Sequence, residues 1–216
     1  MLGLDFRLPA GRAPVFLFIG AHCDDIEIGC GGAVLELLAR HPAARVHWVV
    51  LSSNELRAKE ARKAARMMLR GRPDASVQVH GFRESHFPWE APAIKACFES
   101  LKPLAPDVVF THCRDELHQD HRTVGELSWN TFRNHVILEY EIPKFDGGLG
   151  SPSVFVPLSA AACKRKVDVL MKCFPSQAAK PWFTPETFLG LMRIRGVECN
   201  APSGYAEAFY SRKLVL

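Results

Sequence analysis

The sequence predicts an α/β fold: one Rossmann-like domain over residues 1–216, built on a doubly wound, mostly parallel sheet of about five to six strands with helices on both faces. Three observations predict it. Short apolar runs alternate with stretches of helical periodicity at least four times along the chain. The apolar runs are continuous, as in strands buried on both faces. Polar clusters directly follow two of these runs, where open α/β sheets bind their ligands.

The individual elements follow from local signals. Apolar runs bounded by turn-forming residues predict strands at 15–21, 46–51, 76–81, 107–111, 136–140 and 154–156. Helical spacing of apolar residues, often behind a capping residue or proline, predicts helices at 29–40, 55–70, 93–102, 123–132, 160–173 and 185–195. Residues 1–14 are expected to be an irregular lead-in, and 142–216 a less regular C-terminal part. The aromatic, proline-containing segment 82–90 is expected to be a loop.

Composition narrows the function classes. The hydrophobic and charged contents, 48% and 23%, are ordinary for a soluble globular protein. The net charge of +4 is scattered, and its densest cluster, 164–166, is expected to be a solvated helix face rather than a nucleic-acid patch. Seven cysteines without a close-paired framework favour reduced thiols in the cytoplasm. No apolar stretch approaches the ~18 residues of a membrane anchor.

Two polar clusters, AHCDD at 21–25 and HQDH at 118–121, each follow a predicted strand. Two histidines and a carboxylate are a common catalytic zinc set, which leaves one position open for water. A structural zinc site would need four closed ligands, usually thiolates, and the sequence contains no CxxC pair. If 118–121 opens a helix, its two histidines lie on one face. The adjacent aspartates repel each other, so one should bind a cation while the other works beside it.

AHCDD followed by GCGG, with HQDH after a later strand, resembles the LmbE/PIG-L family of zinc-dependent de-N-acetylases. Weaker similarity to the family extends to the helical segment 54–69, to Ser176-Gln177, to Arg195-Gly196 and to YAEAF at 205–209. The resemblance implies a hydrolase that removes an N-acyl group, most often acetyl, from an amino sugar or its conjugate.

The resemblance also implies a ligand set. His22, Asp25 and His121 would bind zinc (Zn²⁺), although iron (Fe²⁺) could replace it in the cell. Asp24 would be the general base that takes a proton from the attacking, zinc-bound water.

Two further residues gain roles from the resemblance. His118 would act as an imidazolium that stabilises the oxyanion, and Asp120 would orient His118 and raise its pKa. Two positions depart from the family pattern. Cys23 stands where proline is usual and leaves the loop's rigidity open. Glu116 stands where some relatives have a tyrosine that aids the oxyanion.

Four polar residues near the predicted strand ends are candidates for binding the substrate: Glu55, Arg57, Arg83 and Asp115. The expected partner is a soluble, acetylated amino-sugar compound. A homo-oligomer is compatible with the sequence, and neither nucleic acid nor a membrane is an expected partner.

Other interpretations stay open. The same ligands could hold Fe(II) in an oxygenase, or the site could be a catalytically silent sugar- or nucleotide-binding module. The glycines 29, 31 and 32 are expected to permit tight packing rather than phosphate binding. The histidines outside the two clusters are expected to be structural or on the surface, with His112 the nearest rival ligand.

Overall fold

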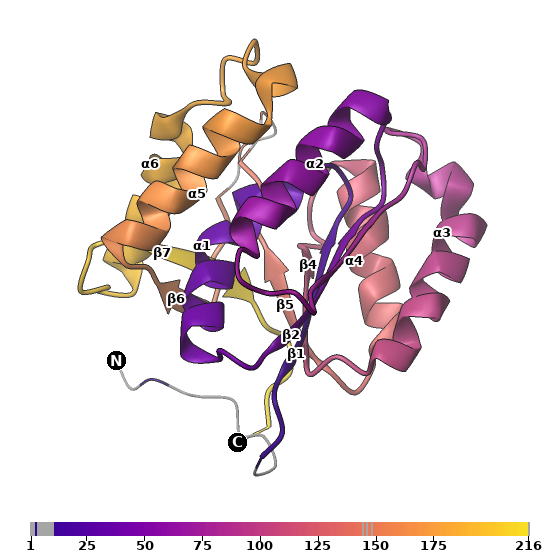
Figure 1. Ribbon diagram of the computed structural model, residues 1–216, viewed down its shortest axis with the longest axis horizontal. Helices are drawn as coiled ribbons and strands as arrows, with labels where there is room; N and C mark the ends of the chain where they lie inside the picture. The colour runs from indigo at the N-terminus through magenta and orange to yellow at the C-terminus, as the bar shows by residue number, and fades with distance from the viewer. Residues whose placement is uncertain (1–2, 4–10, 144, 146, 148, 216) are drawn as a thin grey trace.

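The computed structural model describes Gly3, residues 11–143, 145 and 147, and residues 149–215. Within these residues, seven strands form one sheet in the order β3-β2-β1-β4-β5-β7-β6 (Figure 1). The strands are β1 Val15–Gly20, β2 Arg45–Val50, β3 Ser76–Val79, β4 Val108–His112, β5 Val136–Tyr140, β6 Val154–Pro157 and β7 Ala206–Tyr210. The first five pair in parallel, and β7 pairs antiparallel with both β5 and β6.

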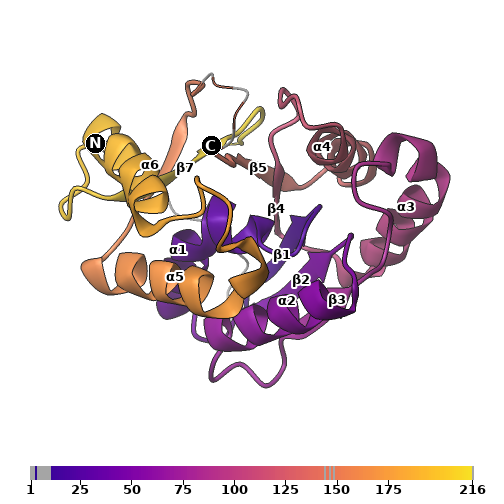
Figure 2. The same ribbon diagram turned by 90° about the horizontal axis from the view of Figure 1, so that it is seen from above.

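Helices cover both faces of the sheet, as the sequence predicts. They are α1 Asp25–Arg40, α2 Glu55–Met68, α3 Phe87–Leu101, α4 Gln119–Thr131, α5 Ala160–Cys173 and α6 Pro185–Glu198, with 3-10 turns η1 Lys102–Leu104 and η2 Pro175–Gln177. Figure 2 shows α1, α2 and α5 on one side and α3 and α4 on the other. None of the described helices is both long and apolar enough to cross a membrane.

Alternate residues of each central strand enter two separate cores. Phe16 and Phe18 of β1 pack in the core beneath α1, α2 and α5. Leu17 and Ile19, which point the other way, pack in the core beneath α3 and α4. Burial on both faces accounts for the continuous apolar run that predicts this strand. The doubly wound fold class is confirmed.

The strand order reverses beside β1. Chain connections lead from β1 to β2 and β3 on one side, whereas β4 and β5 lie on its other side. Ligands of open α/β sheets bind at such a switch point, beyond the carboxyl ends of the strands. Both polar clusters lie there, because AHCDD follows β1 and HQDH follows β4.

The structure corrects several local predictions. Helices α1 and α4 begin about one turn earlier than their apolar periodicity suggests, and polar site residues occupy those first turns. The predicted loop at 82–90 ends early, because α3 begins at Phe87 with Pro88 in its first turn, where proline is tolerated. The tail at 196–216, for which the sequence predicts no element, contains β7, a strand beyond the six that are predicted. Most of the lead-in at 1–14 lies outside the described residues.

Another correction concerns Lys166, which the sequence places on a solvated helix face. Its side chain is only 3% exposed and donates hydrogen bonds to Glu207 Oε1 and to the carbonyl oxygen of Ile28, each across 2.6 Å. Glu207 of β7, which lies far along the chain, is the buried partner of this lysine, and their ion pair explains why Lys166 is not exposed.

Candidate active site

The first half of the site is the turn between β1 and α1. The backbone N–H of His22 donates to Asp25 Oδ2 across 2.6 Å, which closes the turn. Asp25 is the first residue of α1, where the helix dipole favours a carboxylate. His22, Asp24 and Asp25 are all buried.

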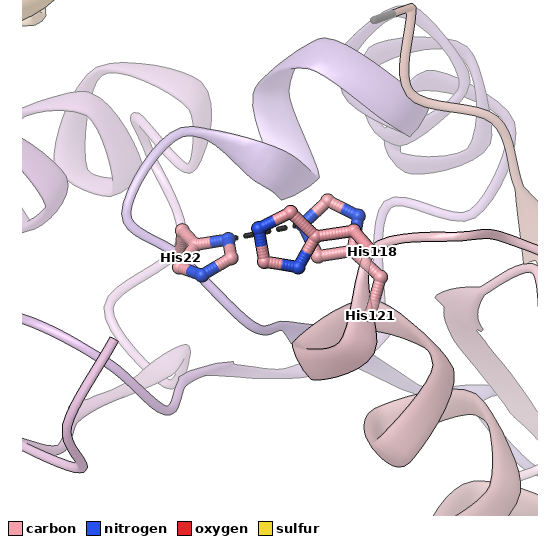
Figure 3. Close-up of side chains that lie close together, drawn as sticks. All are labelled: His22, His118 and His121. Carbon is pink, nitrogen blue, oxygen red and sulfur yellow. Dashed lines mark hydrogen bonds between the residues drawn. The ribbon is translucent and has the colours of Figure 1, made fainter. Parts of the chain in front are cut away.

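The second half is the start of α4. His118 is the N-cap of this helix, and its Nδ1 accepts a hydrogen bond from the backbone N–H of Asp120 across 3.2 Å. His121 lies in the first helical turn, so its ring follows that of His118 on the same side. Figure 3 shows the imidazoles of His22, His118 and His121 converging from the two segments.

The donor atoms of His22, Asp25 and His121 have the spacing that a zinc ion requires. His22 Nδ1 lies 2.9 Å from His121 Nε2 and 3.4 Å from Asp25 Oδ2. His121 Nε2 lies 3.5 Å from Asp25 Oδ2. Zinc bonds of ~2.0–2.1 Å in tetrahedral geometry place ligand atoms roughly 3.3 Å apart. Two imidazoles and one carboxylate at these separations fit a three-ligand zinc site.

Each histidine of this set has a carboxylate on its other nitrogen. His22 Nε2 lies 3.1 Å from Asp120 Oδ2, and His121 Nδ1 lies 2.5 Å from Glu116 Oε1. Because an ionised carboxylate only accepts hydrogen bonds, these nitrogens carry the protons. When both rings are neutral, His22 Nδ1 and His121 Nε2 are therefore left with lone pairs for a metal.

Among the residues that the structure describes, two other donor sets are close enough to hold a metal. One is His22, His118 and His121, and the other is Asp25, His112 and His121. His112, expected to be structural or on the surface and the nearest rival ligand, is fully buried, and its Nε2 lies 3.0 Å from Asp25 Oδ2. That nitrogen also accepts from the backbone N–H of Ala21 across 3.0 Å. His112 is the last residue of β4, at the switch point of the sheet, and this position is the signal that could have identified it as a site residue.

The buried groups of the site shift one another's pKa values in opposite directions. Burial alone would lower the pKa of His22, but Asp25 and Asp120 outweigh it and raise this pKa to about 10. Burial would raise the pKa of Asp25, but the surrounding imidazoles hold it well below its usual range. Burial lowers the pKa of both His112 and His121 to about 3. His112 and His121 are thus kept neutral, whereas His22 pairs with the Asp25 and Asp120 carboxylates as a cation and must release a proton from Nδ1 before it can bind a metal.

Asp24 occupies the N-cap position of α1, but its side chain faces α2 instead of capping the helix. Its Oδ1 accepts a hydrogen bond from the Arg57 guanidinium across 2.6 Å. Burial raises the pKa of Asp24, and Arg57 opposes that rise. Arg57 is one of the four substrate-binding candidates, and the structure brings it directly to the site.

The contacts of Asp120 and His118 differ from the expected ones. The Asp120 carboxylate holds His22 and also accepts from the backbone N–H groups of Ser85 and Phe87, at 2.6 and 3.1 Å. Its link to His118 is through its backbone N–H. Burial and the charge of His22 lower the pKa of His118 although Asp120 opposes them, which favours neutral imidazole over the expected imidazolium.

Cys23 does not point at the donor atoms. Its thiol donates to the carbonyl oxygen of Ser52 across 3.3 Å. Burial raises its pKa to about 12, so it stays a thiol. The substitution at the usual proline position therefore adds no ligand.

The other three candidates for substrate binding are exposed. Glu55 opens α2, and Arg83 lies in the loop between β3 and α3. Asp115 pairs with Arg212 across 2.8 Å rather than with the His118 loop. Their described contacts do not join them to the donor set.

The fold and the donor atoms together define an α/β protein with a metal-capable centre at the switch point of its sheet. The chain belongs to the PIG-L family, described as GlcNAc-PI de-N-acetylase, whose family model matches residues 17–132. That span contains both polar clusters. Family membership supports hydrolytic de-N-acetylation. A search of curated proteins found no match.

Solved structures share the fold. The conserved protein TT1542 from Thermus thermophilus is 22% identical with a TM-score of 0.71, over 93% of this chain and 96% of that one. N,N'-diacetylchitobiose deacetylase from Pyrococcus horikoshii is 20% identical with a TM-score of 0.68, over 93% and 84%. GalB, the 4-carboxy-2-hydroxymuconate hydratase from Pseudomonas putida KT2440, is 17% identical with a TM-score of 0.74, over 94% and 98%. At these identities the similarity shows the fold alone.

Proposed function

We propose that this protein is a zinc-dependent hydrolase that removes an N-acyl group, most often acetyl, from an amino sugar or its conjugate. The observation that carries the proposal is the spacing of His22 Nδ1, Asp25 Oδ2 and His121 Nε2, between 2.9 and 3.5 Å. These atoms would hold the zinc ion, with iron an alternative in the cell. Bound zinc supplies a water whose pKa is lowered to ~7 and polarises the amide carbonyl.

Asp24 is the general base in this proposal. It follows His22 by two residues and precedes Asp25, so its carboxylate lies beside the donor set without being needed as a ligand. Its raised pKa makes it a better proton acceptor than an exposed aspartate. A positioned base of this kind typically contributes a factor of ~10²–10⁴ to the rate.

His118 is the oxyanion donor. Because Nδ1 accepts the backbone N–H of Asp120, the neutral ring carries its proton on Nε2. This N–H can donate a hydrogen bond to the carbonyl oxygen as negative charge develops there. The leaving amine would take the proton that Asp24 has accepted from the water. Removing one such donor typically costs a factor of ~10²–10³.

The substrate class rests on the family description and on the acetylated-sugar deacetylase among the structures of the same fold. We place the reaction in the cytoplasm, because the seven cysteines are all free. Arg57 is the described candidate that is best placed to contact the substrate, since it already reaches Asp24.

The test is acetate release from a panel of acetylated amino sugars by zinc-loaded protein, with Asp24→Asn beside the wild type. We expect release by the wild type, and loss of release with retained metal in the variant. Undiminished release by Asp24→Asn would refute the base assignment. Turnover that requires O₂ would favour the Fe(II) oxygenase, and sugar binding without release would favour the silent module.

A further inference from the structure

Glu116 lies directly behind a proposed metal ligand. Its Oε1 is 2.5 Å from His121 Nδ1, and its Oε2 is 3.9 Å from His112 Nδ1. The Glu116 side chain is only 9% exposed, so it faces the histidines rather than a substrate. Glu116 stands at the position where some relatives have a tyrosine that aids the oxyanion.

Ring stacking fixes the plane of His121. Its centroid lies 3.9 Å from that of His112 and 4.4 Å from that of His118, with interplanar angles of 23° and 22°. Two rings cannot share one face of an imidazole at these distances, so His121 lies between them. The side chain is therefore unable to tilt away from the donor set.

Stacking does not decide which edge of His121 faces the donors. A half-turn about the Cβ–Cγ bond keeps the ring in the same plane, and this torsion is broad and roughly two-fold. The half-turn would exchange Nε2 for the carbon Cε1 and leave no lone pair toward His22 Nδ1 and Asp25 Oδ2. A hydrogen bond from Nδ1 to a fixed carboxylate removes this ambiguity.

We propose that Glu116 is a positioning residue, which selects the orientation of His121 that presents Nε2 to the metal. The inference rests on the metal site of the proposed function, but not on its reaction. Carboxylates that hold a ligand histidine in this way typically account for ~10–100-fold in metal affinity.

The experiment measures zinc affinity by chelator competition, without substrate, in Glu116→Ala, Glu116→Asp and Glu116→Gln. Aspartate keeps the charge but is too short to reach Nδ1, whereas glutamine keeps the reach and an accepting oxygen. We expect zinc to bind ~10–100-fold more weakly to Glu116→Ala and Glu116→Asp, with Glu116→Gln closer to the wild type. Glu126→Ala, at an exposed position of α4, the helix that carries His121, is the control and should bind zinc normally.

Ring-nitrogen NMR of zinc-loaded protein provides a second readout. It should report metal on His121 Nε2 in the wild type and in Glu116→Gln, and a changed or mixed state in Glu116→Asp. If Glu116→Ala does not fold, the aspartate and glutamine variants decide the question. Wild-type affinity and an unchanged spectrum in Glu116→Asp would overturn the proposal. Zinc binding that depends on Glu116 without acetate release would overturn only the proposed function.

Discussion

The guanidinium of Arg57 donates a hydrogen bond to Asp24 Oδ1 across 2.6 Å, where both side chains are largely shielded from water. The two residues follow adjacent strands, β1 and β2, so sheet order rather than sequence proximity brings them together. Burial raises the pKa of Asp24, and the positive charge of Arg57 lowers it. Arg57 therefore sets the pH range in which Asp24 can accept a proton.

Replacing Arg57 should move the pH dependence of hydrolysis. A general base works only when it is unprotonated, so activity falls as the pH drops through its pKa. Without Arg57 the pKa of Asp24 rises further, and the acidic limb of kcat/KM in Arg57→Ala should move to higher pH by ~1 unit or more. The measurement is a pH–rate profile at constant zinc content. Arg57→Lys should move the limb less, and an unmoved limb in Arg57→Ala would show that Arg57 does not act on the base.

Single substitutions can separate the three possible donor sets. If His22, Asp25 and His121 are the ligands, His118→Ala should retain zinc and lose ~10²–10³-fold in kcat. His22→Ala should lose zinc, because it removes one of only three protein ligands. Metal content after dialysis against a weak chelator measures both outcomes.

His112→Gln tests the third set. It should retain one zinc per chain, since His112 Nε2 already accepts a hydrogen bond from the backbone N–H of Ala21. Loss of zinc in His112→Gln would assign the metal to Asp25, His112 and His121. Loss of zinc in His118→Ala would instead favour the set that contains His118.

The sequence predicts the sheet well because strands buried on both faces leave a continuous apolar signal. It misses β7, whose AEAFY carries the acid Glu207 and resembles a mixed tail until β5 and β6 supply its partners. The first turn of α4 is also missed, because its residues are polar. There the helix is shaped by the N-cap His118 and by polar site residues, which do not follow apolar periodicity.

The two polar clusters are recognisable because each is contiguous in sequence. The contacts that support these clusters join residues far apart in the sequence and are not recognisable from it. Asp120 and His22 are 98 residues apart in the sequence, and Arg57 and Asp24 are 33 residues apart. Such contacts depend on which strand ends become neighbours, and spacing along the chain does not encode that order.

The glycines of the GCGG segment, which follows AHCDD, differ in how closely neighbouring side chains pack against them. A Cβ on Gly29 would lie 2.2 Å from the buried ring of Tyr140, whereas one on Gly31 would lie 3.3 Å from the flexible tip of Met68. Gly29→Ala should therefore destabilise the fold by ~1–3 kcal/mol through overpacking, and weaken zinc binding by displacing the turn that holds Asp25. Denaturant unfolding and chelator competition measure the two effects. Gly31→Ala is the matched control, and equal behaviour of the two variants would contradict this account.

The buried pair of Lys166 and Glu207 replaces backbone hydrogen bonds at a kink in α1. Cys30 has non-helical dihedral angles, and beyond it the N–H groups of Gly32 and Ala33 donate to the Glu207 carboxylate at 2.9 and 2.6 Å. On the other side of the kink, Lys166 binds the carbonyl oxygen of Ile28. The pair thus fixes the angle at which the first turn of α1, with Asp24 and Asp25, leaves the rest of the helix.

Breaking this pair should be more damaging than removing both of its charges. Lys166→Met leaves the Glu207 carboxylate buried without its counter-charge, a loss that typically costs ~3–5 kcal/mol. The double variant Lys166→Met with Glu207→Gln buries no charge, so its free energy of unfolding should lie closer to that of the wild type. Urea unfolding of the single and double variants measures the coupling. Lys164→Met, at an exposed position of the same helix, should change stability little because its partner Asp168 is on the surface. Additive losses in the double variant would show that the two residues stabilise the kink independently.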